Sequence, residues 1–240
     1  MKFRFDGQQG ESICSGLADL EIENRVADET LKNGKNYITK AIRIKKVKDG
    51  NLVAFNKYEL DLINRWLFKS NYKVLEIGRY VYYVIFFKEN TWMKDVDKGY
   101  VDLQIRLKPY AYSNKMFNSF MVVGEKISTI YNRGNYEEDT IVEVKLCDNI
   151  ATTISIQNLT TNKVTEFSNL IQNEHIYIDG SNDYITSKID NKRDLYKKFN
   201  GIYLKLAKGV NEIKLISDGR IKVAICYQSK IDLGEVWLNE

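Results

Sequence analysis

The chain has little of what disulfide frameworks, metal sites and catalytic centres are built from. Its 240 residues include one proline, one histidine and three cysteines. Cys14, Cys147 and Cys226 are odd in number, far apart and without a CxxC pair, so the sequence predicts neither a disulfide framework nor a zinc site. We expect all three to be buried or half-buried free thiols.

Long apolar runs and a strong charge of one sign are also missing. The longest apolar run, residues 80–87, is far shorter than the roughly 20 residues that a membrane-spanning helix needs. No apolar stretch follows Lys2 and Arg4, so we predict no signal peptide and expect synthesis in a reducing cytoplasm. With 36 basic against 32 acidic residues, the charge balance gives no reason to expect specific nucleic-acid binding.

The common nucleotide-binding, metalloprotease and hydrolase motifs are absent from the sequence. His175 lies in an alternating segment without evident catalytic or metal-binding partners, so we interpret it as an ordinary strand residue. Residues 179–190 have some features of a calcium loop, but Tyr184 stands where the sharp turn requires glycine, which favours a turn between strands. The acidic groups at 137–139 and 95–97 are interpreted as solvated loops. We therefore expect no enzymatic activity, no cofactor and no metal.

What the sequence does contain favours strands, because 16 Tyr and 10 Phe accompany abundant Ile and Val. Residues 101–107 alternate apolar with polar side chains, as a half-buried strand does. The same alternation at 42–45 precedes Asp49-Gly50, a tight-turn signal, and predicts a hairpin. The basic cluster of this hairpin, from Arg43 to Lys48, is interpreted as a solvated edge rather than a phosphate site.

One helix is predicted, over about residues 56–69. Asn56 is suited to cap its first turn, and Glu59 three residues later completes a capping box. At about 100° per residue, two apolar stripes follow along this helix. The first should pack on the sheet of the same domain: Leu60, Ile63 and Leu67. The second lies further round and needs another cover, which is either a loop of the same chain, such as 88–98, or a partner protein: Tyr58, Leu62 and Trp66.

The strand pattern stops at Pro109, which places a domain boundary near residues 109–120. We predict domains at 1–112 and 113–240. The second contains only short segments with strand character, typical of an all-β sandwich, and these include 120–123 with 127–131 and 212–216 with 220–227. The aromatic residues Trp92, Tyr184 and Trp237 could stack on sugars, but the sequence does not group them. The predicted fold class is mainly β.

Several short segments, taken in order, resemble the distal tail proteins (Dit) of long-tailed phages of Gram-positive bacteria. The resemblance extends over almost the whole chain. Lys108 departs from it, because members of this family often have an acidic residue at the position before this proline. The segments are Phe3-Arg4-Phe5-Asp6-Gly7, Arg65-Trp66-Leu67, Leu107-Lys108-Pro109-Tyr110-Ala111-Tyr112, Ile156-Gln157-Asn158-Leu159-Thr160-Thr161, Ile176-Tyr177-Ile178-Asp179 and Leu206-Ala207-Lys208-Gly209-Val210-Asn211-Glu212-Ile213.

The resemblance implies an N-terminal β-barrel or sandwich with one helix, followed by a galectin-like or carbohydrate-module-like β-sandwich. It also implies a structural protein of the virion tail tip or baseplate whose first domain forms a ring of six copies. Its implied partners are the chain itself, the tail tube protein, a tail hub or tail-associated lysin or fibre protein, and receptor-binding proteins. In such a protein Tyr58, Leu62 and Trp66 are the candidate interface. The alternative is a carbohydrate-binding module that recognises cell-wall saccharide.

Overall fold

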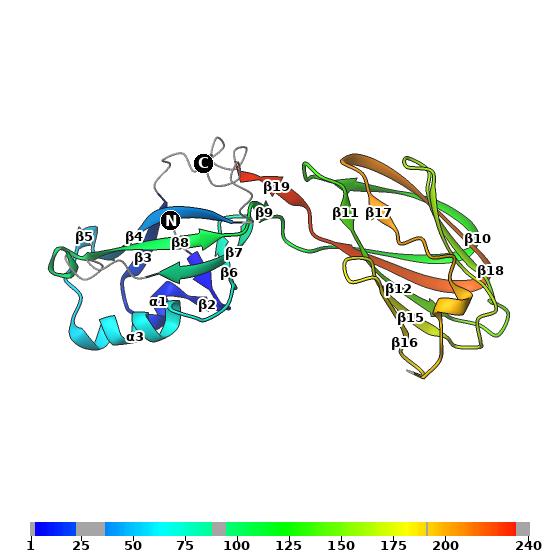
Figure 1. Ribbon diagram of the computed structural model, residues 1–240, viewed down its shortest axis with the longest axis horizontal. Helices are drawn as coiled ribbons and strands as arrows, with labels where there is room; N and C mark the ends of the chain where they lie inside the picture. Colours follow the sequence, from blue (N-terminus) through cyan, green and yellow to red (C-terminus); the bar gives the residue numbers. More distant parts are fainter. Residues whose placement is uncertain (1–2, 23–36, 88–94, 191, 234–240) are drawn as a thin grey trace. The chain divides into compact units, whose positions relative to one another are not determined.

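The computed structural model describes residues 3–22, 37–87, 95–190 and 192–233. The chain forms two compact units (Figure 1). The first comprises the residues up to Tyr112 together with those from Asp232 onward, and the second comprises Ser113–Ile231. Both units consist mainly of antiparallel strands, so the predicted fold class is confirmed.

The first unit is organised around one sheet with the strand order β2-β1-β6-β7-β8-β4-β3, in which β5 pairs with β4 and β9 with β7. Its elements are β1 (Phe3–Phe5), β2 (Gln8–Gln9), α1 (Gly10–Ile13), β3 (Leu17–Ile22), β4 (Ile38–Lys48), β5 (Asn51–Leu52), α3 (Lys57–Leu67), β6 (Lys73–Ile77), β7 (Tyr80–Phe87), the 3-10 turn η1 (Val96–Lys98), β8 (Tyr100–Leu107) and β9 (Tyr110–Tyr112). The strand β19 (Lys230–Asp232) contains the point at which the chain re-enters this unit.

Local patterns explain much of this sheet. In β8 the predicted alternation is confirmed, because Val101, Leu103, Ile105 and Leu107 are all at most 1% exposed while the residues between them are half-buried. The predicted hairpin is confirmed too, since β5 pairs with the end of β4. Its two turn residues, Asp49 and Gly50, have φ angles of 51° and 80°, the left-handed values that a tight hairpin turn requires.

The second unit contains two strands much longer than the sequence predicts. Segments 120–123 and 127–131 are one strand, β10 (Met116–Asn132), and segments 212–216 and 220–227 are one strand, β18 (Gly209–Tyr227). The other elements are β11 (Glu138–Asp139), β12 (Ile141–Leu146), β13 (Ile154–Asn158), β14 (Lys163–Phe167), β15 (His175–Asp179), β16 (Tyr184–Ser187), the 3-10 turn η2 (Tyr196–Lys198) and β17 (Lys205–Leu206).

The strand β18 connects two branches of the sheet. It pairs with β10 along its full length, so β13 and β12 share its other edge, β13 at residues 213–217 and β12 at 221–226. Between these two stretches, Asp218 and Gly219 have no partner on β10, and the register shifts at Val123/Gly124. The branches β14-β13 and β12-β15-β16 then enclose one apolar core. This is the architecture of a sandwich.

Three buried amide side chains attach the short β11–β17 pair to this sandwich. Asn211 is completely buried, accepts a hydrogen bond from the Ala207 N–H at 2.8 Å and donates to the carbonyls of Ala207 and Gly209. Asn158, also completely buried, donates to Asn211 at 2.9 Å and to the Lys205 carbonyl at 2.8 Å. Asn132 donates to the carbonyl of Leu206. Buried amides bonded in this way fix the backbone that they contact.

The cysteine prediction is partly wrong. All three cysteines are free thiols, but Cys147 is exposed, whereas Cys14 is buried and Cys226 is half-buried. Cys147 comes directly after the last residue of β12, and the sequence alone does not indicate its exposure. No helix among the described residues is both long and apolar enough to span a membrane.

Candidate functional site

The helix α3 is the element around which the first candidate site is built. The predicted capping box is present: the Glu59 N–H donates to the Asn56 side chain at 2.9 Å, and the Asn56 N–H donates to the Glu59 carboxylate at 2.8 Å. The helix ends at Leu67, two residues before the predicted end at Lys69, with Phe68 as its C-cap. Its first stripe is buried as predicted, because Leu60, Ile63 and Leu67 are at most 6% exposed.

The Glu59 carboxylate also connects the start of α3 to β4. Lys46 of β4 lies 2.8 Å from it. Burial alone would raise the pKa of Glu59, but the hydrogen bonds from Lys46 and the Asn56 N–H lower that pKa below its ordinary value. Burial, followed by the nearby Glu59 charge, raises the pKa of the Cys14 thiol to about 11. Cys14 therefore remains a protonated, unreactive thiol at neutral pH.

The second stripe of α3 is divided between surface and core. Tyr58 is 68% exposed, Leu62 is half-buried and Trp66 is only 5% exposed. Trp66 stacks on Phe3 with ring centroids 5.5 Å apart, and its indole N–H donates to the Phe5 carbonyl at 3.1 Å. The cover over Trp66 is thus strand β1 of the same unit. Tyr58 and Leu62 are the members of the stripe that remain accessible.

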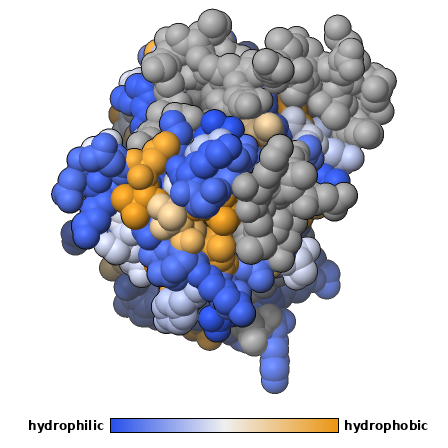
Figure 2. Space-filling view, turned by 90° about the vertical axis from the view of Figure 1, so that its left-hand side faces the viewer, coloured by the Kyte–Doolittle hydropathy of each residue, from blue (hydrophilic) through white to orange (hydrophobic). Residues whose placement is uncertain are grey.

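A groove of about 390 Å³ lies beside the accessible part of α3. Leu62, Arg65 and Trp66 contribute from the helix, and Asp6, Ser12 and Ile13 contribute from the segment that contains β1, β2 and α1. On the face of the first unit that Figure 2 shows, apolar side chains reach the surface as a narrow patch bordered by hydrophilic residues. A groove with an apolar floor and charged rims suits protein contacts better than chemistry on a small molecule.

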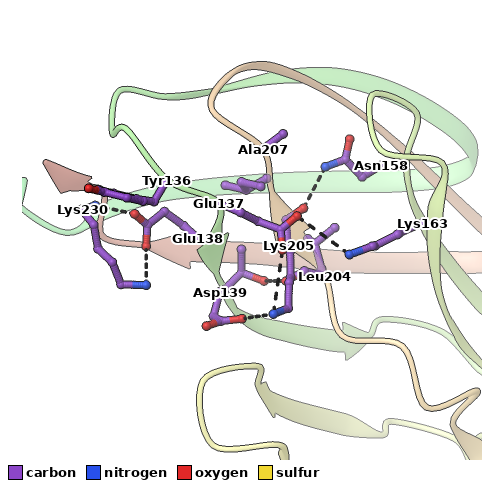
Figure 3. A network of polar contacts seen from close by, with 12 residues as sticks. Tyr136, Glu137, Glu138, Asp139, Asn158, Lys163, Leu204, Lys205, Ala207 and Lys230 are labelled. Atoms are coloured by element: carbon purple, nitrogen blue, oxygen red, sulfur yellow. Dashed lines mark hydrogen bonds and ion pairs between the residues drawn. The ribbon is translucent and has the colours of Figure 1, made fainter. Parts of the chain in front are cut away.

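The acidic segment 137–139 is only in part the solvated loop that the sequence predicts, because Glu137 is exposed but Glu138 is buried (Figure 3). Glu138 and Asp139 form β11, and Glu138 is only 2% exposed. Its carboxylate accepts a hydrogen bond from the Lys230 N–H and lies 3.3 Å from the Lys230 ammonium. Asp139 lies 3.0 Å from Lys205, and Glu137 lies 3.8 Å from Lys163. Each carboxylate is therefore part of an ion pair that anchors β11.

The pKa shifts of Glu138 and Lys205 are explained by burial and by contacts within this network, as expected for a structural role. Burial raises the pKa of Glu138, although the Lys230 N–H and ammonium oppose the shift. The hydrogen bond to Asp139 raises the pKa of Lys205, so this lysine stays charged. The sequence reasoning missed the network because Lys230 lies 92 positions from Glu138, and no local pattern relates the two.

The other candidate residues that the sequence offers, His175 and Asp179, have ion-pair or hydrogen-bond partners nearby. His175 lies 3.3 Å from Glu143, which also contacts Lys188 at 2.8 Å, and hydrogen bonding to Lys188 lowers the pKa of Glu143. Asp179 accepts hydrogen bonds from the N–H groups of Ser181 and Asn182, as a turn residue does. Across the described part of the chain, no group of three or more His, Cys, Asp or Glu side chains could hold a metal ion.

The basic cluster and the aromatic candidates are dispersed. Arg43 of the cluster makes two hydrogen bonds to Asp102, at 2.7 and 2.9 Å, and lies over the Tyr100 ring. Tyr184 is 48% exposed on β16. Trp92 and Trp237 lie outside the described residues.

Comparison with known proteins places these features in a family context. Residues 110–227 match the family described as "Phage tail C-terminal domain". The SPbeta prophage-derived uncharacterized protein YomH of Bacillus subtilis (strain 168) is 26% identical over 173 residues, which cover 69% of this chain and 68% of that protein.

Among solved structures, the Dit protein of phage SPP1 is similar with a TM-score of 0.60 and 11% identity, over 95% of this chain and 98% of the SPP1 chain. That protein is described as a paradigm of the hub adsorption apparatus in phages that infect Gram-positive bacteria. At this identity the likeness concerns the fold. The chain thus has the Dit fold through both units, its second unit is similar to a phage tail domain, and its sequence relative comes from a prophage.

Proposed function

We propose that this chain is a structural component of a phage tail tip or baseplate, in which six copies form a ring that connects the tail tube to the hub and adsorption apparatus. The observation that carries the proposal is the SPP1 Dit fold along 95% of the chain. The match of the second unit to a phage tail domain supports it independently. In this role the protein acts without catalysis, and its partners are other copies, the tube protein, and a hub, lysin or fibre protein.

The outer face of α3 is the surface that we assign to the ring contact. Trp66 provides a rigid floor because β1 holds it in place, and Tyr58 and Leu62 stand beside it with accessible apolar surface. Arg65 and Asp6 line the groove with opposite charges. Aromatic anchors next to a preformed groove are typical of the residues that dominate binding energy in protein interfaces.

The experiment compares the mass of the purified full chain with that of two variants by light scattering. The unmodified chain is expected at six times the monomer mass or at a multiple of that value. Tyr58→Glu combined with Leu62→Glu should abolish the ring and reduce the mass to that of no more than two chains, with an unchanged unfolding curve, because neither side chain is buried in the core. Tyr184→Glu, at a comparably exposed tyrosine of the second unit, is the matched control and should keep the ring. A ring that survives the double substitution would refute the surface assignment, and an unmodified chain that stays monomeric would refute the ring.

A groove in the second unit favours a second candidate function, the binding of cell-wall saccharide. This groove has a volume of about 440 Å³, and Phe199, Ser155, Glu166, Lys198 and Asn200 are among its lining residues. Phe199 is half-buried and stacks on Phe167 at 4.9 Å. A phenyl ring supported from behind and surrounded by hydroxyl, amide and charged groups can hold a sugar ring. Retention of the chain on immobilised cell-wall polysaccharide, lost in Phe199→Ala, would support this function, and passage without retention would exclude it.

A further inference from the structure

The strand β10 of the second unit has an edge that none of the described strands covers. It pairs with β18 through all of its residues from Met116 to Asn132. Among the described elements β18 is its only partner, so the N–H and C=O groups that point away from β18 form a row along one side of β10. Figure 1 shows β10 and β18 as two long strands that run together along the second unit.

Apart from Lys126, the side chains of β10 do not protect this edge in the usual way. Natural edge strands carry lysine, proline or short lengths that prevent pairing with another chain. Within β10 the charged residues are Glu125 and Lys126, and Glu125 is held 2.9 Å from Lys214 of β18. The outward-facing row is instead largely apolar and exposed. Its exposed fractions are 68% for Phe117, 43% for Met121, 72% for Val123, 55% for Ile127 and 54% for Tyr131.

This outward row is close to symmetric about Gly124. Counting away from Gly124 in both directions, the third position is aliphatic on each side, Met121 and Ile127. The fifth position carries a hydroxyl on each side, Ser119 and Thr129. The seventh is aromatic on each side, Phe117 and Tyr131, and only the first position differs in character, Val123 and Glu125.

Gly124 itself suits a position at the centre of such a pattern. Its φ angle is +70°, a left-handed value that favours glycine, and no atom lies within 4 Å of where a side chain would begin. The backbone at this point is therefore open to a close neighbour.

From this symmetry we propose that β10 pairs edge to edge with β10 of a second copy of this chain, antiparallel, about a two-fold axis at Gly124. In that register Phe117 lies opposite the partner's Tyr131, Ser119 opposite the partner's Thr129 and Met121 opposite the partner's Ile127. Aromatic, hydroxyl and aliphatic pairs directly opposite each other are the pairs that stabilise antiparallel strands. An extended segment of a different protein would have no reason to match this symmetry.

The pairing goes beyond the proposed ring and does not depend on it. Neighbours in a ring of six are related by a six-fold axis, whereas an antiparallel pair of identical strands requires a two-fold axis. The contact therefore joins copies that belong to two different rings, or two free chains.

Engineered cysteines test the register directly in the full chain. Cys147→Ser and Cys226→Ser remove the two accessible thiols, while the buried Cys14 is kept. Ser119→Cys and Thr129→Cys are then introduced together. Directly opposed residues in an antiparallel pair have Cα atoms about 4.5–5.5 Å apart, within the range that a disulfide spans. Within one chain the two positions lie ten residues apart on an extended strand, too far to bridge.

The expected result is a covalent dimer on non-reducing electrophoresis for the double variant and not for either single variant. The Tyr58→Glu, Leu62→Glu form should cross-link equally well, which separates this contact from the ring.

Ile127→Lys should halve the mass seen by light scattering in that ring-deficient form, whereas Val210→Lys, an equally exposed valine on β18, should leave it unchanged. Absence of the dimer, or equal dimer from the single variants, would overturn the proposal. A mass loss in Ile127→Lys without cross-linking would overturn it as well, because β10 would then hold another register or another occupant.

Discussion

Trp66 links helix α3 to strand β1, and its replacement measures how much of the first unit depends on that link. We consider Trp66→Phe, Trp66→Ala and Trp66→Glu. In the native unit the indole is 5% exposed, stacks on Phe3, contacts Phe5 edge to face at 5.9 Å and donates to the Phe5 carbonyl at 3.1 Å. The perturbation therefore acts on packing and on one hydrogen bond.

The magnitudes follow from burial. A tryptophan buries about 150–250 Å², which at about 25 cal/mol per Å² corresponds to about 4–6 kcal/mol. Truncation of large aromatic residues in cores costs about 3–5 kcal/mol, so we expect Trp66→Ala to lower the free energy of unfolding of the first unit by about 4 kcal/mol. Trp66→Phe keeps a ring but leaves the Phe5 carbonyl without its donor, at a cost of about 1–3 kcal/mol. Trp66→Glu places an unpaired carboxylate in the core and should unfold the unit.

The assay is urea unfolding followed by far-UV circular dichroism, with Tyr58→Ala as the matched control on the same helix. Because Tyr58 is 68% exposed, its truncation should change the free energy of unfolding by no more than about 0.5 kcal/mol. If Trp66→Ala unfolded at the same urea concentration as Tyr58→Ala, or if Trp66→Glu stayed folded, the assignment of Trp66 to the core would be wrong.

Three further predictions concern the second unit and the turns. Asn211→Ala removes a completely buried amide and leaves the half-buried Ala207 N–H and the Ala207 and Gly209 carbonyls without it, so thermal unfolding should show a loss of about 3 kcal/mol that Asn182→Ala, at an exposed turn, does not share. Hydrogen bonds from the N–H groups of Ala151 and Arg220 lower the pKa of Asp148, so its contribution to stability is complete above the ordinary value of 3.8 and is lost as pH falls below it. Melting temperatures between pH 6 and pH 2 should accordingly fall less steeply for Asp148→Asn than for Asp183→Asn, and parallel curves would contradict this reasoning. Gly99→Ala should destabilise the first unit more than Gly7→Ala. Both glycines have positive φ angles, but only at Gly99 would the added methyl group lie 2.8 Å from the Val53 nitrogen. Equal urea midpoints for the two variants would refute this steric argument.

Features determined by neighbouring residues could be predicted from the sequence. The capping residues Asn56 and Glu59 and the turn Asp49-Gly50 lie within a few positions of the residues they bond, so their patterns are local. The alternation in β8 is local in the same sense.

The long strands were predicted as fragments because Gly124 and Asp218-Gly219 look like chain breaks. In the structure Asp218 instead accepts hydrogen bonds from the N–H groups of Thr152 and Thr153, more than 60 positions away, and β18 continues past it. Distant partners likewise explain why the cover of Trp66 by β1 and the burial of Glu138 by Lys230 were not predicted. The helix and its two stripes could therefore be predicted from the sequence, while the accessibility of the residues in the second stripe depends on parts of the chain far away in sequence.

The single strand β18 has a consequence for how the second unit opens. Its first part is hydrogen-bonded to β13 and its second part to β12, so neither branch of the sandwich can detach without disrupting a strand that the other branch also uses. The two branches should consequently behave as one cooperative unit, with amide protons of β12 and β13 exchanging with solvent at the same free energy of opening. A tail component built in this way resists partial unravelling when force reaches it through one branch, because the load passes along β18 into the whole unit.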